Sequence, residues 1–432
     1  MKKKVYVLGG YGLIGSACIR RLTSAGFEVV GVGRSIAKGM RSNSQINWQV
    51  VDIANASVSE WQDLLSDANI IVNAAGALQN GGRDDLEAIH VKAIKKLTEA
   101  LSGTSVTFVQ ISAAGANEEA STEFMRSKAR GDKVLSQSQL NWLILRPTLV
   151  ISRDAYGGTA ILRAAAAFPL INLQIFPTTQ IQTVSIDDLT HAVAKAANGM
   201  IRSGVVADLT EKGAQSFDEV KREFRCWLGF NPWRCKVSAP ACSIKLLCLT
   251  SDLAGLLGWR SPLRTNAMKS LEHGITGDTK AWDAAGGFPC RSLQETLNSM
   301  PATLQERWFS KLYLMLPLAI CVLAFFWFSS GVISLISISD AQLVLSERGM
   351  SSDTAKLLVV TGSFADIVLG VSVLIRRFSK LACLGMIALS TGYLVSSLFT
   401  APDLWLDPLG PLIKVIPSMA LTMFTISILD DR

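Results

Sequence analysis

Residues 5–22 of the chain read VYVLGGYGLIG followed by SACIRRL, and this stretch decides the fold of the first half. A short apolar run stops at a cluster of glycines and resumes with helical spacing, which predicts a strand, a tight turn and a helix. In such a turn Gly9 supplies a positive φ, Gly12 leaves room for a phosphate, and Gly15 lets the helix pack closely on the strand. The free N–H groups of the first helical turn favour a pyrophosphate, so the stretch predicts a dinucleotide-binding turn.

Composition limits the functions open to the chain. Its 432 residues suffice for two domains or more, and a hydrophobic content of 49% is high for a purely soluble protein. The formal charge of +7 lies within residues 1–307, because the remainder holds equal numbers of basic and acidic residues. This charge suits an anionic membrane surface, and the lack of a basic cluster with interleaved aromatics argues against nucleic acid. The eight cysteines form no Cys-x-x-Cys pair, so we expect reduced thiols and no metal site.

Strands and helices alternate after the glycine turn, which predicts an α/β fold with a Rossmann-type, doubly wound parallel sheet. The ends of parallel strands at their carboxyl edge are where ligands bind in such sheets. The expected helices cover residues 84–102 and 122–136, and the expected further strands cover residues 28–33, 49–53, 70–76, 107–112 and 142–147.

Three strand ends carry residues suited to a dinucleotide. The second strand ends at Arg34, where an acid often binds the ribose of NAD. A guanidinium can instead bind a 2′-phosphate, so we expect NADP to be preferred over NAD, the alternative being a solvated arginine. The third strand carries Asp52, whose carboxylate would meet the adenine amino group. The small residues 74–76 leave room for the cofactor.

Taken together, these residues resemble an atypical or extended short-chain dehydrogenase/reductase, in the branch related to the NADPH-binding accessory subunit of respiratory complex I. The resemblance covers residues 3–230 and also rests on Leu145-Arg146-Pro147 and on VSIDDL at residues 184–189. It implies that NAD(P) is held by Gly9, Gly10, Tyr11, Gly12, Leu13, Ile14, Gly15, Arg34, Ser35, Asp52, Ile53, Ala74, Ala75, Gly76 and Lys128.

The chain departs from this family at the catalytic motif. Active members use Tyr-x-x-x-Lys, in which the tyrosine donates a proton and the lysine binds the nicotinamide ribose and lowers the phenol pKa. Here the motif reads Phe124-Met-Arg-Ser-Lys128, and phenylalanine cannot donate a proton. The resemblance therefore leaves Ser112 and Lys128 as catalytic candidates, although Ser112 is equally interpreted as a strand-end hydroxyl. Each of the three histidines, His90 among them, is isolated in the sequence and is expected to be a surface or packing residue.

After Trp308 the sequence changes to four charge-poor segments, each long enough to span a bilayer. This region resembles the DoxX-like family of four-helix membrane proteins, and the resemblance implies bacterial membrane redox surroundings. It is carried by Trp327, Ser330-Gly331, residues 366–370 and residues 404–411 with Lys414 and Pro417. Asp366 lies in the middle of a span, which fits either a proton or quinone site or a hydrogen bond between helices. The four expected spans are residues 312–335, 357–375, 381–399 and 411–429.

We therefore expect an NAD(P)-binding domain at residues 1–230, a helical substrate-side lobe or linker at 231–307, and an all-α four-helix transmembrane domain at 308–432. One hypothesis is a membrane-anchored NAD(P)(H)-dependent oxidoreductase of a lipid or quinone-like substrate. The alternative is a non-catalytic NADPH-binding scaffold or sensor in a membrane redox complex. Both place the chain in a bacterial inner membrane, with the bilayer as a partner.

The orientation in the membrane is the first testable prediction. Arg376, Arg377 and Lys380 lie in the short loop between the second and third spans, and such cations remain in the cytoplasm. Reporter fusions at the ends of successive segments should read in, out, in, out, in. The fusion points are Arg307, Asp340, Lys380, Asp407 and Arg432. A reporter at Arg432 that reads out would contradict the four-span arrangement.

Overall fold

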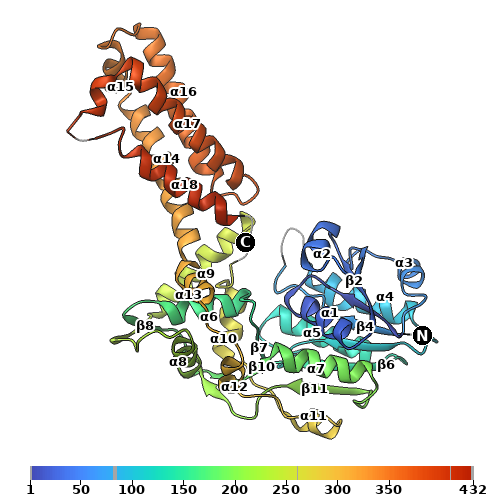
Figure 1. The fold of residues 1–432 in the computed structure, drawn as a ribbon. Coiled ribbons are helices and arrows are strands. Elements are labelled where there is room, and N and C mark those ends of the chain that lie inside the picture. The colour runs from blue at the N-terminus through green and yellow to red at the C-terminus, as the bar shows by residue number, and fades with distance from the viewer. Residues whose placement is uncertain (1, 81–84, 260, 409, 430–432) are drawn as a thin grey trace. The chain divides into compact units, whose positions relative to one another are not determined.

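The computed structural model describes residues 2–80, 85–259, 261–408 and 410–429 (Figure 1). Within these ranges the chain divides into two compact units. The first unit contains the described residues between 2 and 252 and those from 261 to 310, and the second contains the described residues between 253 and 259 and those between 311 and 429. Residues 430–432, which follow the fourth predicted span, and Leu409 of the DoxX-like pattern lie outside the described residues.

A seven-stranded sheet with all neighbours parallel forms the centre of the first unit. Its order is β11-β6-β5-β4-β1-β2-β3, so the chain begins in the middle and builds outward in both directions. This order confirms the predicted doubly wound, Rossmann-type fold. The strands are β1 (Lys4–Leu8), β2 (Glu28–Gly33), β3 (Asn47–Val50), β4 (Ile70–Asn73), β5 (Thr107–Ile111), β6 (Asn141–Pro147) and β11 (Val205–Leu209).

Helices cover both faces of this sheet, because successive side chains of a strand point to opposite faces. Val5 and Val7 of β1 belong to a buried core shared with α1 and α7. Tyr6 and Leu8 of the same strand belong to a second core shared with α3, α4 and α5. The helices are α1 (Leu13–Ser24), α2 (Ile36–Ser42), α3 (Val58–Leu64), α4 (Ala93–Ala100), α5 (Glu123–Ser136) and α7 (Ile186–Ala197).

The predicted third strand, residues 49–53, is wrong in its position. β3 ends at Val50, and Asp52 and Ile53 lie in the turn that follows. The Asp52 carboxylate accepts hydrogen bonds from the backbone N–H of Ala54 at 3.3 Å and the side-chain amide of Asn55 at 2.8 Å. An aspartate that bonds to its own neighbours favours a turn over a strand, so the bonds of Asp52 to residues 54 and 55 end the pairing soon after Val50.

The predicted helix at residues 84–102 also differs from the structure, and residue 84 lies outside the described residues. A π-helical turn, η1 (Ala88–Lys92), precedes α4. The turn contacts α5 very closely, since a Cβ on Gly131 would lie 2.0 Å from the carbonyl oxygen of His90. The strand β11 is absent from the sequence prediction, because its five residues VVADL show neither alternation nor a continuous apolar run.

The rest of the first unit forms a third core from chain segments that are far apart in sequence. Leu162 of α6, Phe224 of α8 and Leu293 of α12 are all buried in it. Arg163 is 1% exposed, forms an ion pair with Glu306 and donates to the carbonyl oxygen of Ser152 at 2.6 Å. The elements are β7 (Leu149–Ile151), α6 (Gly157–Ala167), β8 (Ile171–Gln174), β9 (Gln180–Ile181), β10 (Thr183–Ser185), β12 (Gln215–Ser216), α8 (Phe217–Trp227), β13 (Cys235–Ser238), α9 (Ala241–Leu256), α10 (Thr265–His273), α11 (Lys280–Ala284), α12 (Leu293–Asn298) and α13 (Leu304–Leu312). The end of α9 from Leu253 and the end of α13 from Lys311 belong to the second unit.

The second unit is helical. Among the described residues, three helical runs are long and apolar enough to cross a membrane: Leu304–Ile336, Ser352–Ser372 and Ser379–Thr400. The predicted fourth span is shorter than expected, because α18 begins only at Val415 and has 15 residues to Leu429. Such a helix rises about 22 Å, less than the roughly 30 Å of a hydrocarbon core. The elements are α14 (Met315–Ile336), α15 (Ile338–Ser346), α16 (Ser352–Ser372), α17 (Ser379–Thr400), η2 (Pro402–Trp405) and α18 (Val415–Leu429).

Glycines and one carboxylate join the long helices. A Cβ on Gly331 of α14 would lie 2.4 Å from the carbonyl oxygen of Ser363 on α16, so these two backbones meet without a side chain between them. Asp366 of α16 accepts hydrogen bonds from Ser330 of α14 at 3.0 Å and from Tyr393 of α17 at 3.4 Å. The carboxylate therefore links three helices, which supports the structural interpretation of Asp366.

Contacts at the two ends of the bundle match the predicted alternation of the loops. At one end, Arg348 after α15 forms an ion pair with Asp403 of η2 at 2.5 Å. At the other end, Arg376 after α16 donates to the carbonyl oxygen of Leu429 at 2.6 Å. The first and third loops therefore meet at one end, and the cationic second loop lies at the other.

The close packing of α14 on α16 generates a prediction about stability. Gly331→Ala should lower the thermal unfolding midpoint of the protein in detergent by several degrees, because the added Cβ overpacks the contact by about 1–3 kcal/mol. Gly392→Ala in α17 is the matched control, since its Cβ would meet nothing within 4 Å. Equal losses in the two variants would contradict the role given to Gly331.

Candidate functional site

The glycine turn lies between β1 and α1, at the carboxyl edge of the sheet. Gly9 has a φ of +71°, and a Cβ on it would lie 2.8 Å from the Cα of Ala75. A Cβ on Gly15 would lie 2.2 Å from the carbonyl oxygen of Gly9. Gly12 is the N-cap of α1, whose first residues are Leu13 and Ile14. The turn thus brings backbone, without side chains, to the positive end of a helix, which fits a pyrophosphate.

The residues after β2 form one side of this edge. The hydroxyl of Tyr11 accepts a hydrogen bond from the backbone N–H of Arg34 at 3.1 Å. The Tyr11 ring packs directly on Gly33, because a Cβ on that glycine would lie only 2.3 Å from the nearest ring atom. Arg34 itself is exposed at the strand end, and Ser35 is the N-cap of α2. The structure therefore brings Tyr11, Arg34 and Ser35 together, with Asp52 exposed beyond β3.

The segment after β4 forms the other side. The backbone N–H of Ala75 donates to the Asn73 side chain at 3.1 Å, and the Asn73 amide donates to Gln110 at 2.8 Å. These bonds hold Ala74 and Ala75 against the glycine turn. Gly76 follows at the surface, and a Cβ there would lie 3.5 Å from Lys128 Nζ.

Lys128 of α5 is buried and points to the end of β5. Its Nζ donates to the carbonyl oxygen of Ile111 at 2.9 Å. Burial lowers the pKa of this ammonium to about 8, and the nearby charge of Asp132 opposes the shift. Two of its three N–H donors are not used by this bond, so the residue can bind hydroxyl groups of a ligand.

Ser112 does not present its hydroxyl proton to a substrate. The Oγ donates to Asp132 at 2.7 Å, and Arg146 Nε donates to the same carboxylate oxygen at 2.9 Å. Burial raises the pKa of Asp132, while Arg146 counters the shift. None of the described residues donates to the other oxygen, Oδ1, which is buried. Asp132 and Arg146 lie beside the catalytic candidates although neither is a predicted site residue. Asp132 could have been found because it lies four residues after Lys128 and so shares its helix face.

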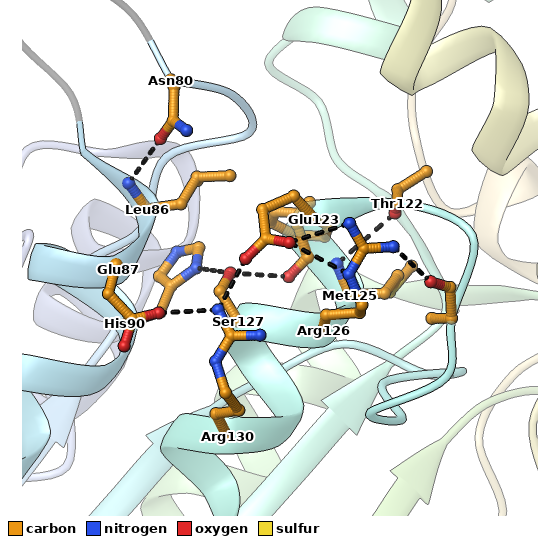
Figure 2. Close-up of polar contacts among 12 residues, drawn as sticks. Asn80, Leu86, Glu87, His90, Thr122, Glu123, Met125, Arg126, Ser127 and Arg130 are labelled. Carbon is orange, nitrogen blue, oxygen red and sulfur yellow. Dashed lines mark hydrogen bonds and ion pairs between the residues drawn. The ribbon is translucent and has the colours of Figure 1, made fainter.

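His90 occupies the space beside the missing phenol, and Figure 2 shows its bond to Ser127. The Nε2 atom accepts the backbone N–H of Ala77 at 3.3 Å, so the proton is on Nδ1, which donates to Ser127 Oγ at 2.8 Å. The rings of His90 and Phe124 meet edge to face with centroids 5.7 Å apart. Burial lowers the pKa of His90 to about 2, with a contribution from the charge of Lys128. This neutral, fully bonded histidine is a packing residue and not an acid.

An ion-pair network near His90 and Ser127 attaches the start of η1 to α5 (Figure 2). Arg130 pairs with Glu87 at 2.6 Å and with Glu123 at 2.5 Å. Arg126 pairs with Glu123 at 2.8 Å and donates to the carbonyl oxygen of Ala120 at 2.7 Å. The charges are about one-third exposed, so we expect them to orient the helices and to add little stability.

Two family models match the chain. Residues 9–199 match an NAD(P)H-binding family, and residues 324–423 match a DoxX-like family. The matches and the fold confirm both resemblances: the chain carries an NAD(P)-binding, short-chain dehydrogenase/reductase-like domain and a C-terminal DoxX-like domain.

Comparisons with individual proteins agree at the level of the fold. The mitochondrial NADH dehydrogenase [ubiquinone] 1 alpha subcomplex subunit 9 of Dictyostelium discoideum is 27% identical over 154 residues. That match covers 34% of this chain and 42% of the relative, so it spans less than half of the relative's length. The enzyme WbmG of Bordetella bronchiseptica, solved with NAD, superposes with a TM-score of 0.52 at 16% identity, over 71% of this chain and 94% of WbmG. WbmH from the same organism, solved with NAD+, gives 0.51 at 17% identity, over 69% and 97%.

The burial of neutral His90 generates a pH prediction. Its pKa of about 2 in the folded protein is below the usual value of about 6.5, so the unfolded chain binds the proton between these values. Stability should therefore fall as the pH drops below about 6.5, by up to about 1.4 kcal/mol per pH unit. We expect the thermal midpoint in detergent to decline more steeply between pH 7 and 5 in the wild type than in His90→Gln. Parallel curves for the two proteins would contradict this assignment.

Proposed function

We propose that this chain, which joins an NAD(P)-binding Rossmann-type domain to a DoxX-like domain, binds NADP(H) as a structural or sensing ligand of a membrane redox assembly. On this proposal the cofactor is held at the carboxyl edge of the sheet by the glycine turn, by Arg34 and by Lys128. A bound nicotinamide dinucleotide would supply hydride chemistry, but the position of the phenol in the motif is occupied here by Phe124.

One observation carries the proposal. Phe124 stands where a phenol would donate a proton, and the hydroxyl of Ser112 is already donated to Asp132. His90, the other polar ring nearby, has both nitrogens in hydrogen bonds. No replacement acid with a hydrogen free for a carbonyl substrate is present among these three side chains. Phenol-assisted carbonyl reduction is therefore disfavoured, while the close-packed glycine turn at the start of α1 supports cofactor binding.

Two further points support binding in a membrane setting. The Dictyostelium relative is a subunit of NADH dehydrogenase. The DoxX-like match and the apolar helices indicate a membrane protein. We propose that this membrane is a bacterial inner membrane and that the nucleotide-binding unit is in the cytoplasm. The presence of Arg376, Arg377 and Lys380 in one loop supports this orientation.

A second candidate function is an oxidoreductase that passes hydride to a lipid or quinone-like acceptor. Lys128 favours it, since a buried ammonium with a pKa of about 8 has protons to give near neutral pH. The two candidates differ in one outcome, which is whether bound cofactor turns over in the purified protein.

Restoring the phenol tests the proposal. Wild-type protein in detergent should bind NADPH and oxidise it with ketones or aldehydes only at background rates. Phe124→Tyr should raise that rate at least tenfold, because the hydroxyl is placed one helical turn from Lys128. Phe124→Leu is the matched control, since it alters the same position without adding a donor.

Rates typical of enzymes, about 1–1000 per second, in the unaltered protein would overturn the binding proposal. They would establish the second candidate and assign the proton to a group other than the phenol. NADPH that fails to bind the wild type at all would contradict both candidates.

The guanidinium of Arg34 determines which dinucleotide we expect to bind. NADP(H) should bind more tightly than NAD(H), and Arg34→Asp should weaken NADP(H) binding by about tenfold or more, the loss expected for a charge-assisted hydrogen bond. Arg41→Asp, an exposed position in α2, changes the charge equally and should leave the preference unaltered. Calorimetric titration that finds NAD(H) preferred in the wild type would contradict the role of Arg34.

A further inference from the structure

The helix α9 (Ala241–Leu256) reverses the usual arrangement of a surface helix. Four leucines, which we call the leucine stripe, face outward with high exposed fractions, while Cys248 and Ser251 are buried on the opposite side. Spacings of three and four residues place the stripe on one face of the helix. The stripe consists of Leu246 (63% exposed), Leu249 (65%), Leu253 (59%) and Leu256 (82%).

The last turn of α9 and the residues that follow it, from Leu253 to Trp259, belong to the second unit, and hydrogen bonds fix this segment within that unit. The backbone N–H of Arg376 donates to the carbonyl oxygen of Leu257 at 2.9 Å. The indole N–H of Trp259 donates to the carbonyl oxygen of Leu374 at 2.7 Å. The Arg376 guanidinium also lies 5.3 Å from the centre of the Trp259 ring. The segment after the leucine stripe is therefore attached to the loop that follows α16.

This loop marks the depth at which the apolar helices leave the membrane. It contains Arg376, Arg377 and Lys380, and cations with a tryptophan are typical of the headgroup level of a bilayer. Because Leu257 and Trp259 are bonded to this loop, the last turn of α9 lies at the same level. Leu253 and Leu256 are exposed in that turn.

We propose that α9 lies along the membrane surface, with the leucine stripe immersed at the boundary between headgroups and acyl chains. With 16 residues the helix is too short to span a bilayer. If α9 instead pointed away from the membrane, only the leucines of its last turn would be removed from water by the bilayer. The stripe continues through Leu249 to Leu246, over most of a helix about 24 Å long, so the whole face has one apolar partner. Lys245 beside it suits an anionic headgroup.

Lipid photolabelling of the full-length protein tests this proposal independently of cofactor binding. The protein is placed in nanodiscs of phosphatidylcholine and phosphatidylglycerol that contain a phospholipid with a diazirine in the upper acyl chain. After illumination, mass spectrometry should locate label on the leucine stripe as well as on α14, α16 and α17. Met200 is the internal control, because it is 66% exposed in the first unit and should remain unlabelled.

Leu249→Glu combined with Leu253→Glu should reduce the labelling of α9 at least fivefold and leave that of α14 unchanged. Met200→Glu is the control substitution and should leave the labelling of α9 intact. Both leucines are exposed, so the double variant should retain the wild-type thermal midpoint.

Label on α14, α16 and α17 with none on α9 would overturn the proposal. Lysine cross-links between the Lys245 residues of two copies, with α9 unlabelled, would assign the leucine stripe to a second copy of the chain instead. Absence of label from all four helices would remove the membrane itself as the partner.

Discussion

The nucleotide-binding edge depends on backbone segments that approach too closely for any side chain to fit between them. A Cβ on Gly15 would meet the carbonyl oxygen of Gly9 at 2.2 Å, and one on Gly9 would meet Ala75 at 2.8 Å. The start of α1, the turn and the segment after β4 are therefore held together by contact between main chains. The N–H groups of the helix remain directed at one place, which is what a pyrophosphate requires.

Burial of charge determines what this edge can do chemically. Lys128 and Asp132 are both buried near the end of β5, so each raises the stability of the other's charged form. Ser112 and Arg146 both donate hydrogen bonds to one oxygen of the Asp132 carboxylate. The Ser112 proton is therefore directed at Asp132 and not at a substrate. Replacing the family's phenol with Phe124 lets a neutral histidine pack beside it. Our proposal that the domain holds a dinucleotide without protonating a substrate rests on this arrangement.

In the helical unit too, close contact between backbones and a hydrogen-bonded buried carboxylate occur together. Where Gly331 allows α14 to touch α16, a carboxylate one turn further on can be reached from both neighbouring helices. Ser330 and Tyr393 then satisfy Asp366, which would otherwise be costly at this depth. The ion pair of Arg348 with Asp403 and the bond from Arg376 to Leu429 fix the two opposite ends of the bundle.

The sequence by itself determined the doubly wound sheet, the glycine turn, the missing phenol and the apolar segments, because periodicity and glycine spacing are local properties. It placed β3 too late and missed β11, since short strands are decided by their neighbours in the sheet. Only the tertiary structure brought Asp132 and Arg146 onto Ser112, and His90 beside Phe124, because these contacts join residues far apart in the chain. It also showed that the outer face of α9 is apolar, since a pattern of leucines does not state which side of a helix is covered.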